Sequence, residues 1–285
     1  MWQRILERQY DELIDYLDDN SPDVCPLYGN ILSSRLKYNP MAMRSGYVYG
    51  YYRGDDLSAV VAVFNDGNAM IHVTDEKLTG NVVEIIRRGY YHSVWGLGGY
   101  LPPMRQLEEY SNYKFEERNL VMMEKIAPTP KACGDDSLEI IRIDRRMRIG
   151  SYMPFIKRCM WEGFGFKSGS WDIKKRMKER TAHEPYFVLS AGGKLVSQAH
   201  IQAMTPKYGY IGGVCTLREE RRKGYAKATV YEVCRYIEGL GRIPALAVSS
   251  ENRAALNLYE SMGFELAGKM KVYMQKREFS GDENQ

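Results

Sequence analysis

The stretch from Thr216 to Lys227 constrains the fold of this chain more than any other part of it. Residues 208–216 lead into it as a short β-prone run punctuated by glycine, and from Ala226 to Ile237 apolar residues recur at helical spacing. The chain between these two patterns is short and rich in Arg and Lys. The sequence therefore predicts a strand, a tight basic loop and a helix, in this order.

This loop has the features of a phosphate-binding turn. Consecutive backbone N–H groups and the positive end of a helix dipole converge at such a junction, and phosphate oxygens bind there. Gly224 and Ala226 are small enough for a ligand to approach the backbone and the first helical turn. The side chains that add positive charge are those of Arg221, Arg222, Lys223 and Lys227.

The spacing Arg221-x-x-Gly224-x-Ala226 resembles the acyl-CoA diphosphate loop of the GNAT N-acetyltransferase superfamily. A second motif lies downstream, where residues 252–264 resemble the pattern Asn-x-x-Ala-x-x-x-Tyr-x-x-x-Gly-Phe of the same superfamily. The two motifs occur in the superfamily's order. The resemblance covers the chain from about Leu138 to Met274.

The second motif predicts a helix that follows a short buried strand at residues 244–248. Asn252 and Tyr259 are seven residues apart, or two helical turns, so they lie on one face of this helix. Gly263 is the expected helix stop. Two compatible roles are open for Asn252: a hydrogen bond to the cofactor and a cap of its own helix.

Length and composition describe a globular chain. A chain of 285 residues is long enough for two domains with hydrophobic cores. With 44% hydrophobic and 27% charged residues, the composition is that of an ordinary globular protein, so we expect disorder only at the chain ends. No apolar run approaches the roughly 18 residues that span a bilayer, and the charged N-terminus lacks the apolar core of a signal peptide. We expect a cytoplasmic protein without a membrane partner.

Charge and cysteine usage narrow the classes of partner. The net charge is +4 with basic and acidic residues interspersed, which does not call for a nucleic-acid partner. The basic runs at 145–148 and 174–180 are interpreted as solvated helix faces rather than binding surfaces. Five widely spaced cysteines without a Cys-x-x-Cys pair and four scattered histidines indicate neither a disulfide framework nor a metal site.

The two halves of the chain share one order of expected elements: helices, three antiparallel strands, then helix, strand, helix and strand. Residues 110–116 also align with 259–265 at both aromatic residues and the glutamate. The resemblance therefore implies an α/β fold class with two tandem GNAT-like folds, each a mostly antiparallel sheet flanked by helices. We expect a degenerate N-terminal domain over 1–126, a linker over 127–137, a catalytic domain over 138–276 and a frayed tail over 277–285.

Only the second half carries the phosphate loop. At the corresponding position of the first half, residues 74–80 place acidic side chains where an anionic diphosphate would sit, which opposes binding. That half is expected to be structural or to supply acceptor contacts. The second half's loop, Thr216-Leu-Arg-Glu-Glu-Arg221, also resembles the glycine N-acyltransferase branch of the superfamily.

The resemblance implies transfer of an acetyl group from acetyl-CoA to a primary amine of a small molecule, by direct attack in a ternary complex. Tyr259 would protonate the departing thiolate, because the pKa of an ordinary tyrosine, about 10, lies above that of a free thiol, about 8.5. Backbone groups at the end of the strand would pair with the pantetheine arm, and the loop would hold the diphosphate. The expected cofactor-binding residues are Val214, Cys215, Thr216, Arg221, Arg222, Lys223, Gly224, Tyr225, Ala226, Lys227 and Asn252. We expect no metal, and a monomer or homodimer.

The general base is not evident from the sequence. His200, on an expected strand, is one candidate, and a structural histidine is the other interpretation. Glu219 and Glu220 are weaker candidates, since loop carboxylates usually face water, and the amine could instead lose its proton to water before it binds. Cys215 as an acyl-carrying nucleophile lacks an activating partner in the sequence, which favours direct attack.

Two other functions stay open: a protein or peptide N-acetyltransferase, and a non-catalytic acyl-CoA-binding module. The acceptor is not encoded in any transferable motif. Aromatic residues in the 152–171 region line an acceptor pocket or, as we favour for most of them, pack in the core. These residues are Tyr152, Phe155, Trp161, Phe164, Phe166 and Trp171.

Overall fold

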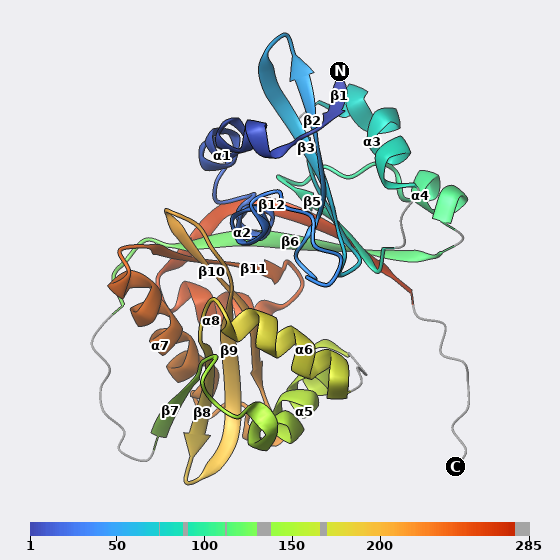
Figure 1. The fold of residues 1–285 in the computed structure, drawn as a ribbon. Helices are drawn as coiled ribbons and strands as arrows, with labels where there is room; N and C mark the ends of the chain where they lie inside the picture. Colours follow the sequence, from blue (N-terminus) through green and yellow to red (C-terminus); the bar gives the residue numbers. More distant parts are fainter. Residues whose placement is uncertain (74, 88–90, 112, 130–137, 166–169, 277–285) are drawn as a thin grey trace, which may run out of the picture. The chain divides into compact units, whose positions relative to one another are not determined.

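The computed structural model describes residues 1–73, 75–87, 91–111, 113–129, 138–165 and 170–276 (Figure 1). The chain forms two compact units, and neither is one contiguous segment. The first unit comprises Met1–Leu27, Ser33–Val121 and Gly268–Gln285, and the second comprises Tyr28–Leu32 and Met122–Ala267. The tail expected over 277–285 and most of the linker expected over 127–137 lie outside the described residues.

Strands and helices alternate along both halves of the chain. The first half contains β1 (Trp2–Arg4), α1 (Tyr10–Asp19), α2 (Cys25–Ser34), β2 (Gly46–Arg53), β3 (Asp56–Phe64), β4 (Asn68–Val73), α3 (Thr79–Ile86), β5 (Ser93–Leu97), α4 (Met104–Ser111) and β6 (Phe115–Lys125). The second half contains β7 (Leu138–Ile143), α5 (Met153–Phe164), α6 (Ser170–Thr181), β8 (Tyr186–Ala191), β9 (Lys194–Met204), β10 (Tyr208–Thr216), α7 (Tyr225–Gly239), β11 (Ile243–Ser249), α8 (Arg253–Glu260) and β12 (Phe264–Gln275). Short 3-10 turns lie at Glu7–Gln9, Glu76–Leu78, Ile149–Tyr152 and Arg218–Glu220.

The sheet of the first unit has the strand order β1-β2-β3-β4-β5-β12-β6. Neighbours β1 to β4 are antiparallel, and β4 and β5 are parallel. Gly54 (φ 62°) and Gly67 (φ 79°) make the tight turns of the two hairpins, which need a left-handed residue. Strands β3 and β4 are largely buried, and the inner faces of α3 and α4 close this core.

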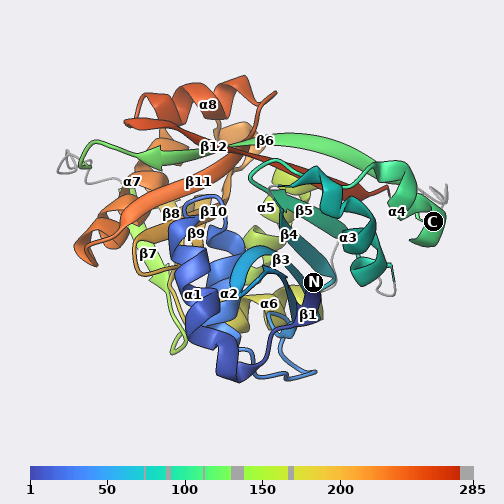
Figure 2. The same ribbon diagram turned by 90° about the horizontal axis from the view of Figure 1, so that it is seen from above.

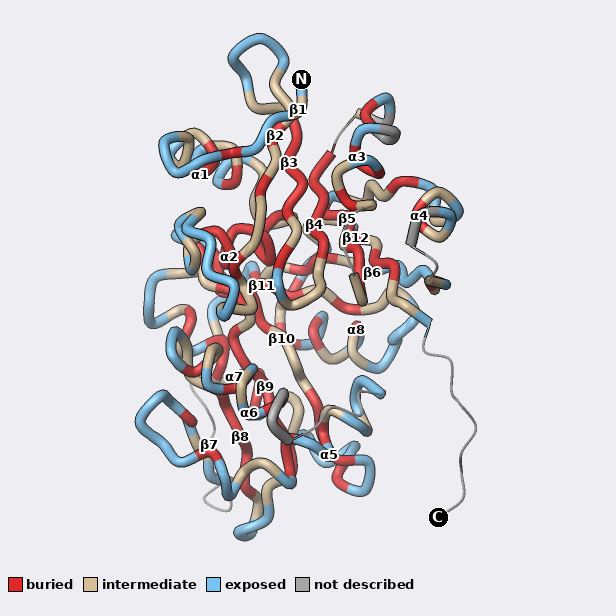
Figure 3. Tube along the Cα trace, turned by 45° about the vertical axis from the view of Figure 1, so that its right-hand side comes forward, coloured by how far each residue is buried: buried red, intermediate tan, exposed pale blue. Residues whose placement is uncertain are grey.

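The sheet of the second unit has the order β12-β6-β11-β10-β9-β8-β7, in which β7 to β10 are antiparallel and β10 and β11 parallel. Helix α7 covers one face of this sheet. The side chain of Ile237 on α7 packs against Gly209 and would lie 2.6 Å from a Cβ added to that glycine, so no larger residue has room there. Helix α5 packs on the opposite face, where the Cys215 thiol lies 3.5 Å from the carbonyl oxygen of Cys159. Between these layers, β8 is almost entirely buried and β9 is mostly buried (Figure 3).

Strands β6 and β12 are neighbours in the sheet (Figure 2), and each contributes residues to both units. Residues Phe115–Val121 of β6 and Gly268–Gln275 of β12 belong to the first unit, and their remaining residues belong to the second. The last strand of the sequence, β12, accordingly pairs with β5, from Met270 opposite Leu97 to Met274 opposite Ser93. The expected ranges 1–126 and 138–276 are contiguous, whereas these units are not. An alternating strand pattern says which face is buried, but not which strand is the neighbour.

The N-terminal segment also differs from its sequence pattern, which predicts one helix over residues 1–20. Trp2–Arg4 instead form β1, which pairs with Tyr49–Tyr51 of β2, and the helix α1 begins only at Tyr10. An edge strand offers a row of free backbone donors and acceptors, and pairing with that row outweighs a short helical periodicity. No helix in the described part of the chain is both long enough and apolar enough to cross a membrane.

Candidate active site

The predicted loop lies between β10 and α7, as the sequence indicated. Arg222 (φ 65°) and Gly224 (φ 82°) both have left-handed backbone conformations, with Lys223 between them. Alternation of this kind curls the chain so that successive N–H groups face one side, as in anion-binding nests. Residues 221–224 are exposed, and among the described residues no side chain caps the N-terminus of α7. The N–H groups of its first turn therefore lack partners within the helix.

Glycine is favoured at position 224 by the left-handed backbone conformation and not by a lack of space for a side chain. No atom lies within 4 Å of a Cβ added at this position. The positive φ favours glycine, and the open space leaves the backbone accessible from outside. Both features agree with the close approach of a ligand that the sequence suggested.

The basic side chains of the loop do not all point outward. The Arg221 Nε donates to the carbonyl oxygen of Thr216 at 3.2 Å, and the Lys223 Nζ lies 2.8 Å from a carboxylate oxygen of Glu220. Lys227 lies over the ring of Tyr231, 5.7 Å from its centroid. Arg222 is exposed. The four predicted cations are thus brought to one junction, but three of them contact other groups of the protein.

Strands β10 and β11 separate next to this loop. Their parallel pairing runs from Tyr208 opposite Ile243 to Ile211 opposite Leu246, whereas β10 continues to Thr216. The register of β10 against β9 shifts between Gly212 and Cys215, and Gly213 (φ 61°) stands in this bulge. Beyond Ile211, β10 is still paired with β9 on one edge, through Cys215 and Thr216. Its other edge extends past the ladder with β11, as a docking strand would need.

The bulge was not part of the sequence prediction. The signal that could have revealed it is Gly212-Gly213 inside a strand pattern, because paired glycines in a strand mark a bulge or a close approach. A Cβ added at Gly213 would lie 2.1 Å from Cε1 of His200. The imidazole therefore packs directly over the bulge.

Helix α8 carries both residues of the second motif. Asn252 is its N-cap, and the side-chain oxygen accepts the N–H of Ala255 at 3.1 Å. Tyr259 is 6% exposed and meets the ring of Phe264 edge to face at 5.8 Å. Burial raises the pKa of Tyr259 far above its usual value. Gly263 (φ 82°) follows the last turn, as expected of a helix stop.

The candidate bases are all engaged with cations. Arg180 of α6 bonds the His200 Nε2, and because a guanidinium only donates, this nitrogen must accept. Its lone pair is therefore not available for an incoming amine. Hydrogen bonds from Lys194 and Lys223 lower the pKa of Glu220 to about 2. The pKa of Glu219 is also lowered, first by the backbone N–H of Glu219 itself and then by Arg158.

The other sequence candidates are distributed between core and surface. Cys215 is 5% exposed, and its thiol donates to the carbonyl oxygen of Cys159 inside the core. Phe155 is buried in the core, whereas Trp161 and Phe164 on α5 are 46% and 38% exposed. Phe166 and the side chain of Trp171 lie outside the described residues. Within the described ranges, no three His, Cys, Asp or Glu side chains are grouped to hold a metal ion.

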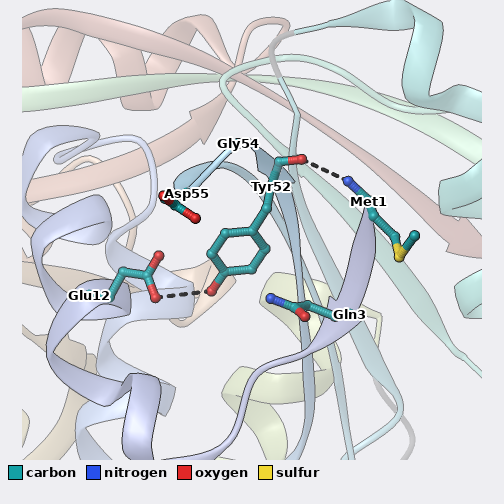
Figure 4. Close-up of a pocket in the computed structure, with 6 residues that line it drawn as sticks. All are labelled: Met1, Gln3, Glu12, Tyr52, Gly54 and Asp55. Carbon is teal, nitrogen blue, oxygen red and sulfur yellow. Dashed lines mark hydrogen bonds between the residues drawn. The ribbon is translucent and has the colours of Figure 1, made fainter.

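A separate pocket of about 460 Å³ opens in the first unit (Figure 4). Tyr52 points into it and donates to Glu12 at 3.1 Å, and the backbone carbonyl of Tyr52 accepts from the N-terminal ammonium group at 2.7 Å. Its lining is mostly polar, and it carries none of the residues of the two motifs. In the same unit, Asp75 of the acidic segment is ion-paired with Arg53.

Residues 154–264 match the model of the acetyltransferase (GNAT) family. This segment contains the loop, the diverging strands and Tyr259. This segment is therefore similar to the acetyltransferase domains of the GNAT family. No sequence among the curated proteins matches the chain.

Solved structures share the fold over almost the whole chain. A Drosophila protein is 11% identical with a TM-score of 0.68, and the match covers 96% of this chain and 98% of that one. A tandem GNAT protein from the clavulanic acid biosynthesis pathway is 12% identical with a TM-score of 0.59, covering 96% and 97%. A GCN5-related N-acetyltransferase from Sphaerobacter thermophilus is 16% identical with a TM-score of 0.59, covering 97% and 95%. The chain thus consists of two tandem GNAT-like folds of mixed α/β class.

Proposed function

We propose that this chain is an acetyl-CoA-dependent N-acetyltransferase whose acceptor is a primary amine of a small molecule. The observation that carries the proposal is the exposed basic loop with left-handed residues at 222 and 224, placed where β10 leaves β11. An accessible cluster of backbone donors beside a free strand edge suits a ligand that has a diphosphate at one end and an amide-bearing arm at the other. The tandem GNAT relative from the clavulanic acid pathway is described as solved without AcCoA, which associates the same ligand with that protein.

The residues at this junction would divide the work of holding acetyl-CoA. The backbone N–H groups of 222–227 would bind the diphosphate, with Arg222 adding a charged side chain. The backbone of Val214, Cys215 and Thr216 would pair with the pantetheine arm along the open edge of β10, and one N–H there would polarise the thioester carbonyl. Asn252 caps α8 through its side-chain oxygen, and its side-chain nitrogen would donate to the cofactor.

Tyr259 would donate the proton that the departing thiolate takes. Its raised pKa keeps the hydroxyl protonated throughout the physiological range, as a general acid must be before it acts. The amine would attack directly and lose its proton to water, because His200, Glu219 and Glu220 are engaged with cations. The first unit would be structural or would contribute to the acceptor site.

Calorimetry with acetyl-CoA tests the loop. Gly224→Trp fills the open space at the loop, so we expect at least a tenfold loss of affinity. Gly241→Trp is the matched control, because Gly241 is also exposed, left-handed (φ 71°) and without atoms within 4 Å of an added Cβ, but follows the other end of α7. Equal binding by the wild type and Gly224→Trp would remove the loop from the proposal.

The acceptor is tested by thiol release across a broad panel of amines, with labelled acetyl-CoA in cell extract as a second arm. Label confined to small molecules supports the proposal, whereas label on polypeptides would assign a protein or peptide acceptor instead.

A non-catalytic acyl-CoA-binding module is the second candidate, and two observations favour it. Tyr259 is enclosed by the protein, and the Nε2 of His200 is occupied by Arg180. Such a module would bind acetyl-CoA through the loop, and Gly224→Trp would weaken that binding as predicted above. It would release no thiol with any amine. Turnover with any amine excludes it.

A further inference from the structure

Glu220 is a buried carboxylate in an otherwise exposed basic loop. It is 9% exposed, whereas its neighbours Arg218 and Glu219 and the following residues 221–224 are exposed. A negative charge beside a site for a diphosphate repels the ligand unless cations offset it. The partners of Glu220 therefore decide its effect.

Each carboxylate oxygen of Glu220 binds a different lysine. The Lys194 Nζ lies 2.6 Å from Oε1, and the Lys223 Nζ lies 2.8 Å from Oε2. The two ammonium groups lower the pKa of Glu220 to about 2, so this carboxylate is ionised at neutral pH. Lys194 begins β9, and Lys223 directly precedes Gly224. Glu220 thus ties the β8–β9 hairpin to the loop.

The same network reaches α5. Glu219 lies 2.8 Å from Arg158 and 3.6 Å from Lys194, and Arg158 also binds Glu162 at 2.6 Å. Glu162 in turn accepts the backbone N–H of Arg218 at 2.9 Å, at the start of the 3-10 turn. The ion pairs join Arg158, Lys194 and Lys223 to Glu162, Glu219 and Glu220.

These pairs balance three positive charges against three negative ones. The ammonium group of Lys223 is paired with Glu220 within this network, although the Lys223 side chain is half exposed. At the loop, the exposed side chain of Arg222 would bind an anion together with the backbone N–H groups.

We propose that Glu220 is a positioning residue for the diphosphate of acyl-CoA. It anchors Lys223 and thereby holds the backbone of 221–224 in the left-handed conformation that presents its N–H groups. Glu220 does not touch the ligand, and the side chain of Lys223 serves as an anchor of the loop. This inference rests on the proposed function, because it assigns a role within the same binding site.

The sign of the effect of Glu220→Gln tests this role. If Glu220 acted only through its charge, removing a negative charge next to a diphosphate would tighten binding. If it positions the loop, the neutral amide loses both ion pairs, its single oxygen can accept from only one of the two lysines, and binding weakens. We expect the Kd for coenzyme A, measured by calorimetry, to rise about tenfold. In the amine assay, KM for acetyl-CoA should rise with little change in kcat.

Glu220→Asp is the second variant, since it keeps the charge but is one methylene too short to reach both lysines. We expect weaker binding again, whereas a charge effect alone predicts none. Glu232→Gln is the matched control, because Glu232 is ion-paired at 2.8 Å with Arg235 on α7. Its Kd should stay within twofold of the wild type, and circular dichroism checks the fold of all three variants.

Two outcomes separate this inference from the function on which it rests. Binding by Glu220→Gln as tight as that of the wild type, or tighter, would overturn the positioning role alone. A wild-type chain that does not bind coenzyme A at all would overturn the proposed function and this role together.

Discussion

Tyr259 combines a sequence motif with an enclosed position. The motif places it on the same face of α8 as Asn252, and the structure buries its ring against Phe264. A buried tyrosine is often a packing residue, so substitution must separate the two interpretations. The hydroxyl alone is at issue, since the ring is needed in either case.

We therefore expect Tyr259→Phe to lower kcat about a hundredfold, which is the smaller end of what a general acid contributes. Its affinity for acetyl-CoA should stay within about twofold, because the ring and α8 are retained. Tyr236→Phe is the control, since this tyrosine of α7 also loses only a hydroxyl, bonded at 3.4 Å to Glu184. Unchanged turnover by Tyr259→Phe would show that the proton comes from another group.

His72 makes the stability of the first unit depend on pH. It is 4% exposed, its Nδ1 bonds the hydroxyl of Tyr16, and burial lowers its pKa from 6.5 to about 4. The unfolded chain thus binds a proton more readily than the folded one between these values. The contribution is complete above pH 6.5 and is lost as the pH falls toward 4, by about 3 kcal/mol in all.

Urea unfolding at about pH 7 and about pH 4 measures this contribution. We expect the loss of unfolding free energy between the two values to be about 3 kcal/mol smaller in His72→Gln than in the wild type, because glutamine does not titrate. The comparison cancels the other groups that titrate in this range. Equal losses in both proteins would contradict the assignment.

At the scale of single elements, β10 and α7 each depend on a left-handed glycine, but for different reasons. Gly213 (φ 61°) has the imidazole of His200 against it, whereas Gly224 (φ 82°) has nothing within 4 Å of an added Cβ. The bulge is therefore sterically locked, and the loop is constrained only by its backbone. We expect the bulge at Gly213 to cause the separation of β10 from β11.

The two glycines form a matched pair for substitution by alanine. Gly224→Ala should cost about 1 kcal/mol, the strain of a left-handed alanine. Gly213→Ala adds overpacking against His200 and should cost roughly 3 kcal/mol. Urea denaturation of both variants gives the difference. Equal costs would mean that His200 moves aside without strain.

The units of the whole molecule are built from distant parts of the sequence. Tyr28–Leu32 and Met122–Lys125 belong to the second unit, although the sequence assigned them to the first domain. Four large side chains in these segments are fully buried: Tyr28, Ile31, Met122 and Met123. At about 1.5–3 kcal/mol each, they contribute roughly 6–12 kcal/mol, as much as the whole stability of a typical domain.

A fragment over residues 127–276 should therefore lack a cooperative unfolding transition. It keeps both sequence motifs but loses these four side chains. Thermal denaturation followed by circular dichroism checks this, with the full chain as the control. A sharp transition in the fragment would show that the second domain is contiguous, as its sequence pattern predicts.

Local features of the sequence determined much of this protein. The strand, loop and helix at 208–239, the cap at Asn252 and the helix stop at Gly263 were predicted, because periodicity, capping and left-handed glycine depend on neighbouring residues. The order of elements followed from the same local patterns, and the tandem GNAT-like folds followed from the resemblance of the two motifs to the GNAT superfamily.

Only the tertiary structure decided which groups meet. The pairing of β12 with β5, the ion pair of Lys194 with Glu220 and the position of His200 over the bulge all depend on contacts that no local pattern encodes. A side chain's partner is chosen by packing and charge in three dimensions, and spacing along the chain carries no record of that choice.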